Sequence, residues 1–136
     1  MTPRPPLPPA FESFVALFNR GAYWESHEVL EDAWRATGSD FYQGLILLAS
    51  AFVHAERHNA HGVRAQLAKA EMRLRTVRPS HLGMDVDAVL DACAAARAAL
   101  ERDTWPDAPR LELRPALARG DEPEWRAPLE PPSAGA

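Results

Sequence analysis

Hydrophobic residues recur along this chain at the spacing of an α-helix, whereas the two-residue alternation of a strand never persists. Phe11, Phe14, Val15 and Phe18 show the helical spacing clearly. Because consecutive helices joined by short connections pack antiparallel, we predict an all-α fold, a compact antiparallel bundle of about five helices. The pattern places these helices at about residues 10–19, 23–36, 40–59, 61–77 and 85–102.

Proline marks the limits of the predicted bundle. Of 13 prolines, five lie before Ala10 and seven after Trp105, which leaves only Pro79 between them. We therefore expect a helical domain at residues 10–104, with a Pro-rich extension at 1–9 and a Pro-rich tail at 105–136. The tail is expected to be extended or partly disordered. Apolar side chains that offer it attachment points are Trp105, Leu111, Leu113 and Trp125.

The third predicted helix is apolar over most of its circumference, which indicates a central position in the bundle. One polar stripe interrupts it. The residues of that stripe are Gln43, Ser50, His54, Arg57 and His58.

Composition narrows the class of protein. A length of 136 residues fits one domain, and a net charge of −4 argues against a dedicated nucleic-acid binder. The single cysteine, Cys93, excludes an intramolecular disulfide and a Cys-rich zinc site, and it is expected to be a small core residue. The sequence shows no signal peptide and no membrane-spanning run, so a cytoplasmic protein without a membrane partner is expected.

The charges are segregated along the chain. Residues 25–40 contain five acids and one arginine, whereas residues 57–78 contain six basic residues and one acid. Such runs are usually solvated helix faces, here with the option of pairing across the bundle. A second interpretation is an anion-binding patch on the fourth helix.

The segment from Trp24 to Trp34, WESHEVLEDAW, carries one histidine and four acids. At about 100° per residue, His27 falls on the apolar face, Glu31 lies just beside that face and Glu28 lies at its margin. An unpaired carboxylate is costly to bury, so Glu31 needs a partner. This segment is therefore the first candidate for chemistry.

If the second and third helices pack antiparallel, His27, Glu31 and His54 converge. Two imidazoles and one carboxylate form a ligand set of catalytic zinc and of non-haem iron, with open positions for water and substrate. Glu28, or else Glu25, is then the candidate general base on a metal-bound water. Side chains expected beside this site are Glu25, Gln43 and Trp24.

The same residues permit two other interpretations. A histidine bonded to a carboxylate is a common way to satisfy polar groups in a core, which makes the cluster a structural network. A ligand pocket without metal is the other. Ser50 and His54 also have the spacing of a nucleophile and a base, but no GxSxG elbow accompanies them.

The blocks FNRGAYWESHEVLEDAW and FYQGLILLASAFVHAERHNAHGVRAQLAKA resemble the small helical proteins of domain of unknown function family 309, over about Phe18 to Leu74. That family is similar to a group labelled predicted metal-dependent hydrolases. The resemblance implies a helical bundle with a site made of the polar residues above. The residues that match the family pattern are Asn19, Glu25, His27, Glu28, Glu31, Trp34, Gln43, Gly44, His54, Asn59 and Gly62.

Two functions of different classes follow as hypotheses. One is a metal-dependent hydrolase that acts on a small molecule, with a divalent zinc or iron held by His27, Glu31 and His54. The other is a non-enzymatic helical binding module in which the cluster is a hydrogen-bond network and the chain forms a homo-oligomer.

Overall fold

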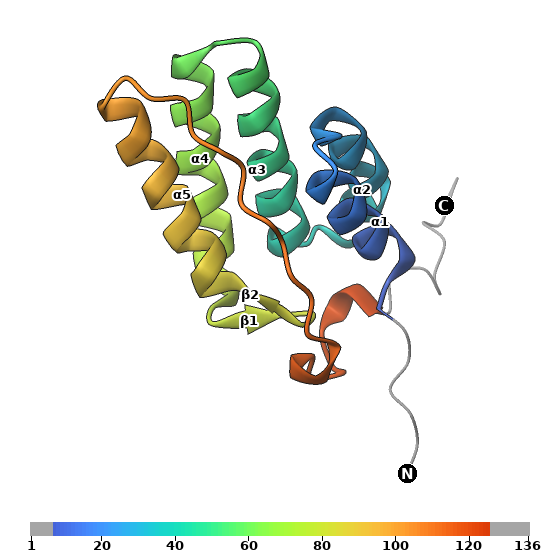
Figure 1. Cartoon of the computed structure of the whole chain (residues 1–136). Helices are drawn as coiled ribbons and strands as arrows, with labels where there is room; N and C mark the ends of the chain where they lie inside the picture. The colour runs from blue at the N-terminus through green and yellow to red at the C-terminus, as the bar shows by residue number, and fades with distance from the viewer. Residues whose placement is uncertain (1–6, 126–136) are drawn as a thin grey trace.

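Five α-helices run up and down in the computed structural model, which describes residues 7–125 (Figure 1). The all-α prediction is confirmed. Residues 1–6 and 126–136 of the predicted extensions lie outside the described residues. Among the helices of residues 7–125, none is both long and apolar enough to cross a bilayer. The helices are α1 (Pro9–Asn19), α2 (Tyr23–Thr37), α3 (Asp40–Glu56), α4 (Ala60–Leu74) and α5 (Val86–Glu101).

Short polar side chains fix where the helices begin. Ser39 accepts from the Tyr42 backbone at the start of α3, and Asn59 accepts from the Gly62 backbone at the start of α4. The third helix therefore ends at Glu56 rather than near Asn59, because Asn59 caps the helix that follows. The last turn expected for the fourth helix is a separate 3-10 turn, Arg75–Val77.

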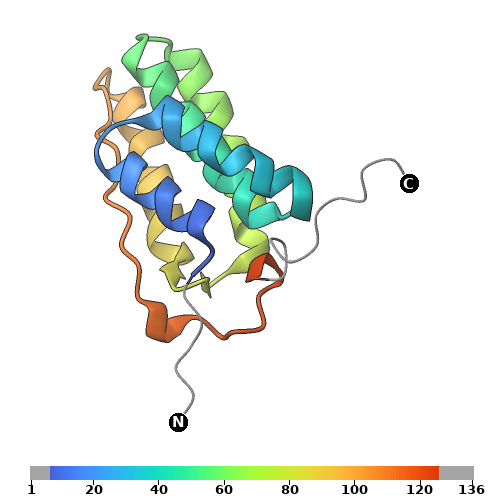
Figure 2. The ribbon, with the colours of Figure 1, turned by 90° about the vertical axis from the view of Figure 1, so that its right-hand side faces the viewer.

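The helix α3 occupies the centre of the fold, between α2 and α4 (Figures 1 and 2). Ten of its 17 residues are buried, as the apolar circumference predicted. The half-buried remainder includes one stripe at i, i+4, i+7 and i+11: Gln43, Leu47, Ser50 and His54. This α3 stripe is thus the side that neither neighbouring helix covers completely.

A small hairpin, which the sequence pattern does not predict, connects α4 to α5. Its strands are β1 (Ser80–His81) and β2 (Met84–Asp85), which pair antiparallel. Two-residue strands are too short for alternation to reveal. The turn between them places Gly83 at a φ of 79°, which glycine adopts without steric cost.

The segment that follows α5 crosses the front of the bundle in Figure 1, from the end of α5 to the region beside α1. We call residues 105–125 the strap. Leu111 and Ala118 of the strap are buried, and Leu113 and Trp125 pack against the core. Asn19 of α1 exchanges two hydrogen bonds with the Leu111 backbone, of 2.8 and 2.7 Å. The strap therefore completes the core on a side that the helices leave open.

Candidate functional site

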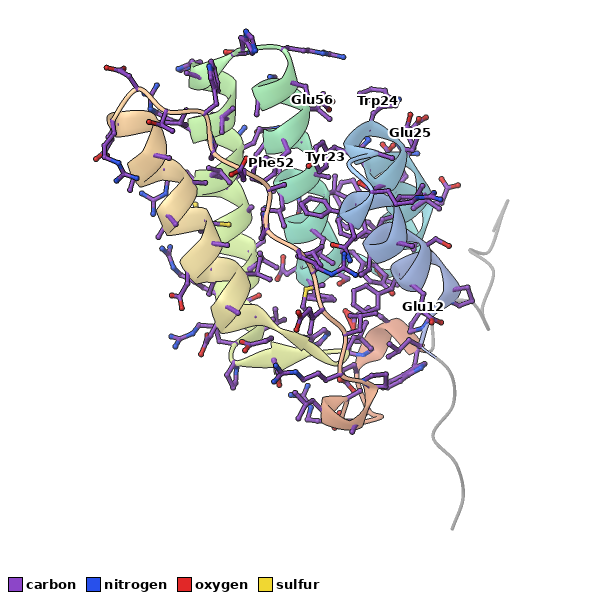
Figure 3. All side chains as sticks on the ribbon, in the orientation of Figure 1. Glu12, Tyr23, Trp24, Glu25, Phe52 and Glu56 are labelled. Atoms are coloured by element: carbon purple, nitrogen blue, oxygen red, sulfur yellow. The ribbon has the colours of Figure 1, made fainter. Side chains whose placement is uncertain are left out.

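The start of α2 presents three predicted site residues to solvent. Trp24 is 51% exposed, and Glu25 and Glu28 are also exposed. In Figure 3 Trp24 and Glu25 lie at the outer end of α2, whereas Tyr23 points toward Phe52 of α3. The Tyr23 and Phe52 ring centroids are 5.7 Å apart. Tyr23 is therefore a core anchor, while its acidic and indole neighbours form an outer surface.

His27 is half-buried, and its ring lies 5.4 Å from the Trp24 ring between centroids. Its Nδ1 atom is fully buried and has no hydrogen-bond partner within the part of the chain that the structure describes. Such an orphaned nitrogen costs free energy, since burial removes its bond to water. His27 is thus the one predicted ligand with a buried atom left unsatisfied.

Glu31, one turn after His27, is paired with a different residue. Its Oε1 atom accepts a 2.5 Å hydrogen bond from Arg35 Nη2, one further turn along α2. The Glu31 side chain is about one-third exposed, so it is at the edge of the core rather than inside it. Glu31 therefore has the partner that the sequence predicted it to need, but this partner is Arg35 of the same helix.

His54 lies in the last turn of α3, beside the connection to α4. Asn59 Oδ1 accepts from the Gly62 backbone N–H at 3.0 Å, which leaves the Asn59 amide nitrogen 3.2 Å from His54 Nδ1. Since an amide nitrogen only donates, Nδ1 is the acceptor and a neutral His54 carries its proton on Nε2. The Nδ1 atom of His54 is therefore already hydrogen-bonded to Asn59.

The predicted ligands do not come together. Within residues 7–125 no group of three or more His, Cys, Asp or Glu side chains is arranged to hold a metal ion. Gln43 lies on the α3 stripe, and Ser50 of that stripe accepts a 2.8 Å bond from Gln66 of α4. Ser50 is thus bonded through its hydroxyl oxygen to a neighbouring helix.

Sequence reasoning missed a buried polar cluster that joins the strap to the body. Glu124 accepts a 2.7 Å bond from the Ser39 hydroxyl, and its other oxygen is 2.7 Å from His81 Nε2. All three residues are buried. Burial alone would raise the pKa of Glu124, but the bonds from His81 and Ser39 outweigh it and lower that pKa. Burial and the Glu124 charge together raise the pKa of the neighbouring Tyr42 hydroxyl.

A second buried carboxylate, Glu122, secures the same end of the strap. It accepts backbone N–H bonds from Leu82, Arg119 and Gly120, at 3.0, 3.1 and 2.8 Å. Burial opposes ionisation, yet these donors lower the pKa of the Glu122 carboxyl. No sequence motif identifies either glutamate. The side-chain partners of Glu124 are 43 and 85 residues away, and the partners of Glu122 are backbone N–H groups. Both carboxylates are buried away from solvent, and their hydrogen bonds attach the strap to the body of the protein.

Residues 11–66 match the model of the family described as Domain of unknown function (DUF309). The family resemblance is confirmed for that segment. No curated protein and no solved structure matches the chain. The DUF309 segment runs from α1 into α4, so it contains the α2 residues, the α3 stripe and the Asn59 turn. The hairpin, α5 and the strap lie beyond it.

Proposed function

We infer that this protein is a non-enzymatic helical interaction module. The polar residues of its DUF309 segment stabilise the fold, and the outer surface of α2 offers a recognition face. One observation carries this proposal. Glu31 and His54, two of the three candidate ligands, each contact a partner only four or five residues further along the chain.

The exposed end of α2 supports the same conclusion. Trp24 is half-exposed beside Glu25 and Glu28, and tryptophan is a residue on which binding energy often concentrates in protein interfaces. An indole surrounded by carboxylates is suited to a partner that combines an apolar patch with positive charge.

A metal-dependent hydrolase is the competing proposal, with His27, Glu31 and His54 as ligands and Glu28 as general base. The orphaned Nδ1 atom of His27 favours it, because a buried nitrogen without a partner is suited to a ligand. The arrangement of the other two side chains does not fit, since no metal-binding group forms among the described residues.

Metal analysis of untagged protein separates the two proposals. For an interaction module we expect zinc and iron well below one ion per chain, and His27→Gln should change the melting temperature without changing metal content. One ion per chain that disappears in His27→Ala would overturn the proposal. Retention of that ion in Glu28→Gln, with loss of a hydrolytic activity, would establish the hydrolase instead.

A further inference from the structure

The outer surface of α4 carries positive charge without partners. Arg64 and Lys69 of α4 and Arg75 of the 3-10 turn that follows it are exposed, and within residues 7–125 none of them forms an ion pair. Met72 lies among them and is 67% exposed. These four residues are the basic face. Met72 adds exposed apolar area to this charged surface, and methionine is a residue that adaptable binding surfaces often use.

The outer surface of α2 carries the opposite charge. Glu25, Glu28 and Asp32 follow one stripe at i, i+3 and i+7, and all are exposed. These three residues are the acidic face. Arg35 approaches Asp32 only at 3.8 Å and makes its short bond to Glu31 instead. Most of this negative charge is therefore also uncompensated.

The two faces cannot neutralise each other within one chain, because α3 separates α2 from α4. The two faces nevertheless lie on either side of the α3 stripe. Gln66 of α4 bonds Ser50 of the α3 stripe, and Lys69 lies one turn further along that edge of α4. The half-buried α3 stripe thus lies between a basic edge and the acidic helix.

Symmetry then determines how a second copy fits. Both α2 and α4 have 15 residues and run opposite to α3, so they are parallel and each about 22 Å long. A two-fold axis parallel to α3 places each α2 against the α4 of the other copy, which closes the dimer with two identical contacts. An axis across α3 would oppose acid to acid. Like-charge repulsion disfavours that second arrangement.

We propose that a second copy of this chain docks across α2, α3 and α4, so that each acidic face meets the basic face of its partner. The α3 stripe lies at the centre of this interface. Trp24 and Met72 supply apolar area, which ionic contacts alone do not. This proposal rests on the interaction module above and names its partner.

Sedimentation equilibrium on the full chain over a range of concentrations is the first measurement. We expect a mass near twice 15.0 kDa at low salt, with weaker association in about 0.5 M salt, where screening is strong. Arg64→Glu with Lys69→Glu should weaken association about tenfold or more. Arg110→Glu with Arg114→Glu is the matched control, since it makes the same charge change on the exposed strap and should leave association unchanged.

Mixing variants provides a sharper test. The Arg64→Glu/Lys69→Glu chain has two acidic faces, and the Glu25→Lys/Glu28→Lys chain has two basic faces. Each should be monomeric alone, whereas an equimolar mixture should form a 1:1 complex and nothing larger. A mixture of the Glu25→Lys/Glu28→Lys chain with the Arg110→Glu/Arg114→Glu control chain should not form this 1:1 complex. Their melting temperatures report whether each variant is folded.

Three outcomes would overturn the second copy as partner. They are a monomeric wild type at every concentration, open oligomers larger than a dimer, or a monomer whose basic face binds an acidic peptide. In each case the metal analysis still decides the interaction module independently, so the two proposals fail separately.

Discussion

At the scale of single residues, close packing explains two glycines of the DUF309 segment. A Cβ on Gly44 would lie 2.8 Å from Leu74, and one on Gly62 would lie 2.5 Å from His54 Nδ1. Both positions are helical, where alanine is otherwise preferred over glycine. Contact between helices, rather than backbone conformation, is therefore what requires glycine there.

Gly62→Ala should lower the free energy of unfolding by about 1–3 kcal/mol, the usual cost of overpacking. The new methyl group would displace the His54 ring from the turn. Chemical denaturation measures the loss. Adding His54→Ala to this variant should recover part of it, since the crowded ring is gone. Strictly additive losses would mean that the two residues are not in contact.

A second residue-scale prediction concerns the ion pair between α4 and α5. Arg97 donates a 2.8 Å bond to Glu71, which is buried. Arg97→Leu leaves that carboxylate buried and unpaired, so we expect a loss of about 2 kcal/mol or more. Glu71→Leu with Arg97→Leu should be less harmful than Arg97→Leu alone. Denaturation of both variants decides it, and equal losses would contradict the argument.

Single residues also show how far sequence patterns reach. The helical spacing of Phe11, Phe14 and Phe18 correctly indicated a buried face, but Ser26 is also fully buried and was not anticipated. A small residue fits because α2 packs against both α1 and α3, and its hydroxyl is satisfied by the Tyr23 carbonyl at 2.7 Å.

Cys93 is buried as predicted, and burial raises its pKa to about 12. Its thiol is therefore unreactive at neutral pH.

At the scale of elements, the helices were predictable because their signals are local. Hydrophobic spacing and caps such as Ser39 and Asn59 lie within or beside each helix. The strap was harder to predict. Leu111 was recognised as an attachment point, but its partner Asn19 is 92 residues away. The candidate metal site depended on distances between helices, which spacing along one helix cannot supply.

The attachment of the strap should depend on pH. The folded state lowers the pKa of Glu124, which His81, Ser39 and Tyr42 face, and that of Glu122. A lowered pKa stabilises the attached strap above the ordinary carboxyl value of 4.5, and this stability is lost as the pH falls through the folded-state value. Because the strap shares its core with the helices, we expect acid to unfold both together, with tryptophan fluorescence and circular dichroism changing over the same pH range. Glu124→Gln should shrink the change in stability below pH 4.5, and an unchanged profile would contradict the assignment.

At the scale of the whole molecule, helices and strap share one core. Phe11, Phe14 and Phe18 of α1 belong to the same buried cluster as Leu111 and Ala118. The strap is thus part of the cooperative unit, although its Pro-rich sequence is typical of an extended tail. The composition of the strap cannot reveal its attachment, because only two of its apolar side chains, Leu111 and Ala118, are buried in the core.

Asn19→Ala should therefore destabilise the entire protein and not only the strap. It removes two hydrogen bonds to Leu111, so we expect a loss of about 1–3 kcal/mol at neutral pH. Helix content by circular dichroism and tryptophan fluorescence should shift together along the denaturation curve. A fluorescence transition that precedes the loss of helix would show that the strap unfolds independently.

The route of the strap also bears on the speed of folding. A bundle of consecutive helices forms mostly local contacts and belongs among the fast folders. Here the contacts from Asn19 to Leu111 and from Ser39 to Glu124 close loops of 92 and 85 residues. Each closure costs chain entropy before its bonds form. The strap therefore raises the contact order of a helical protein, which predicts slower folding than for a bundle of consecutive helices alone.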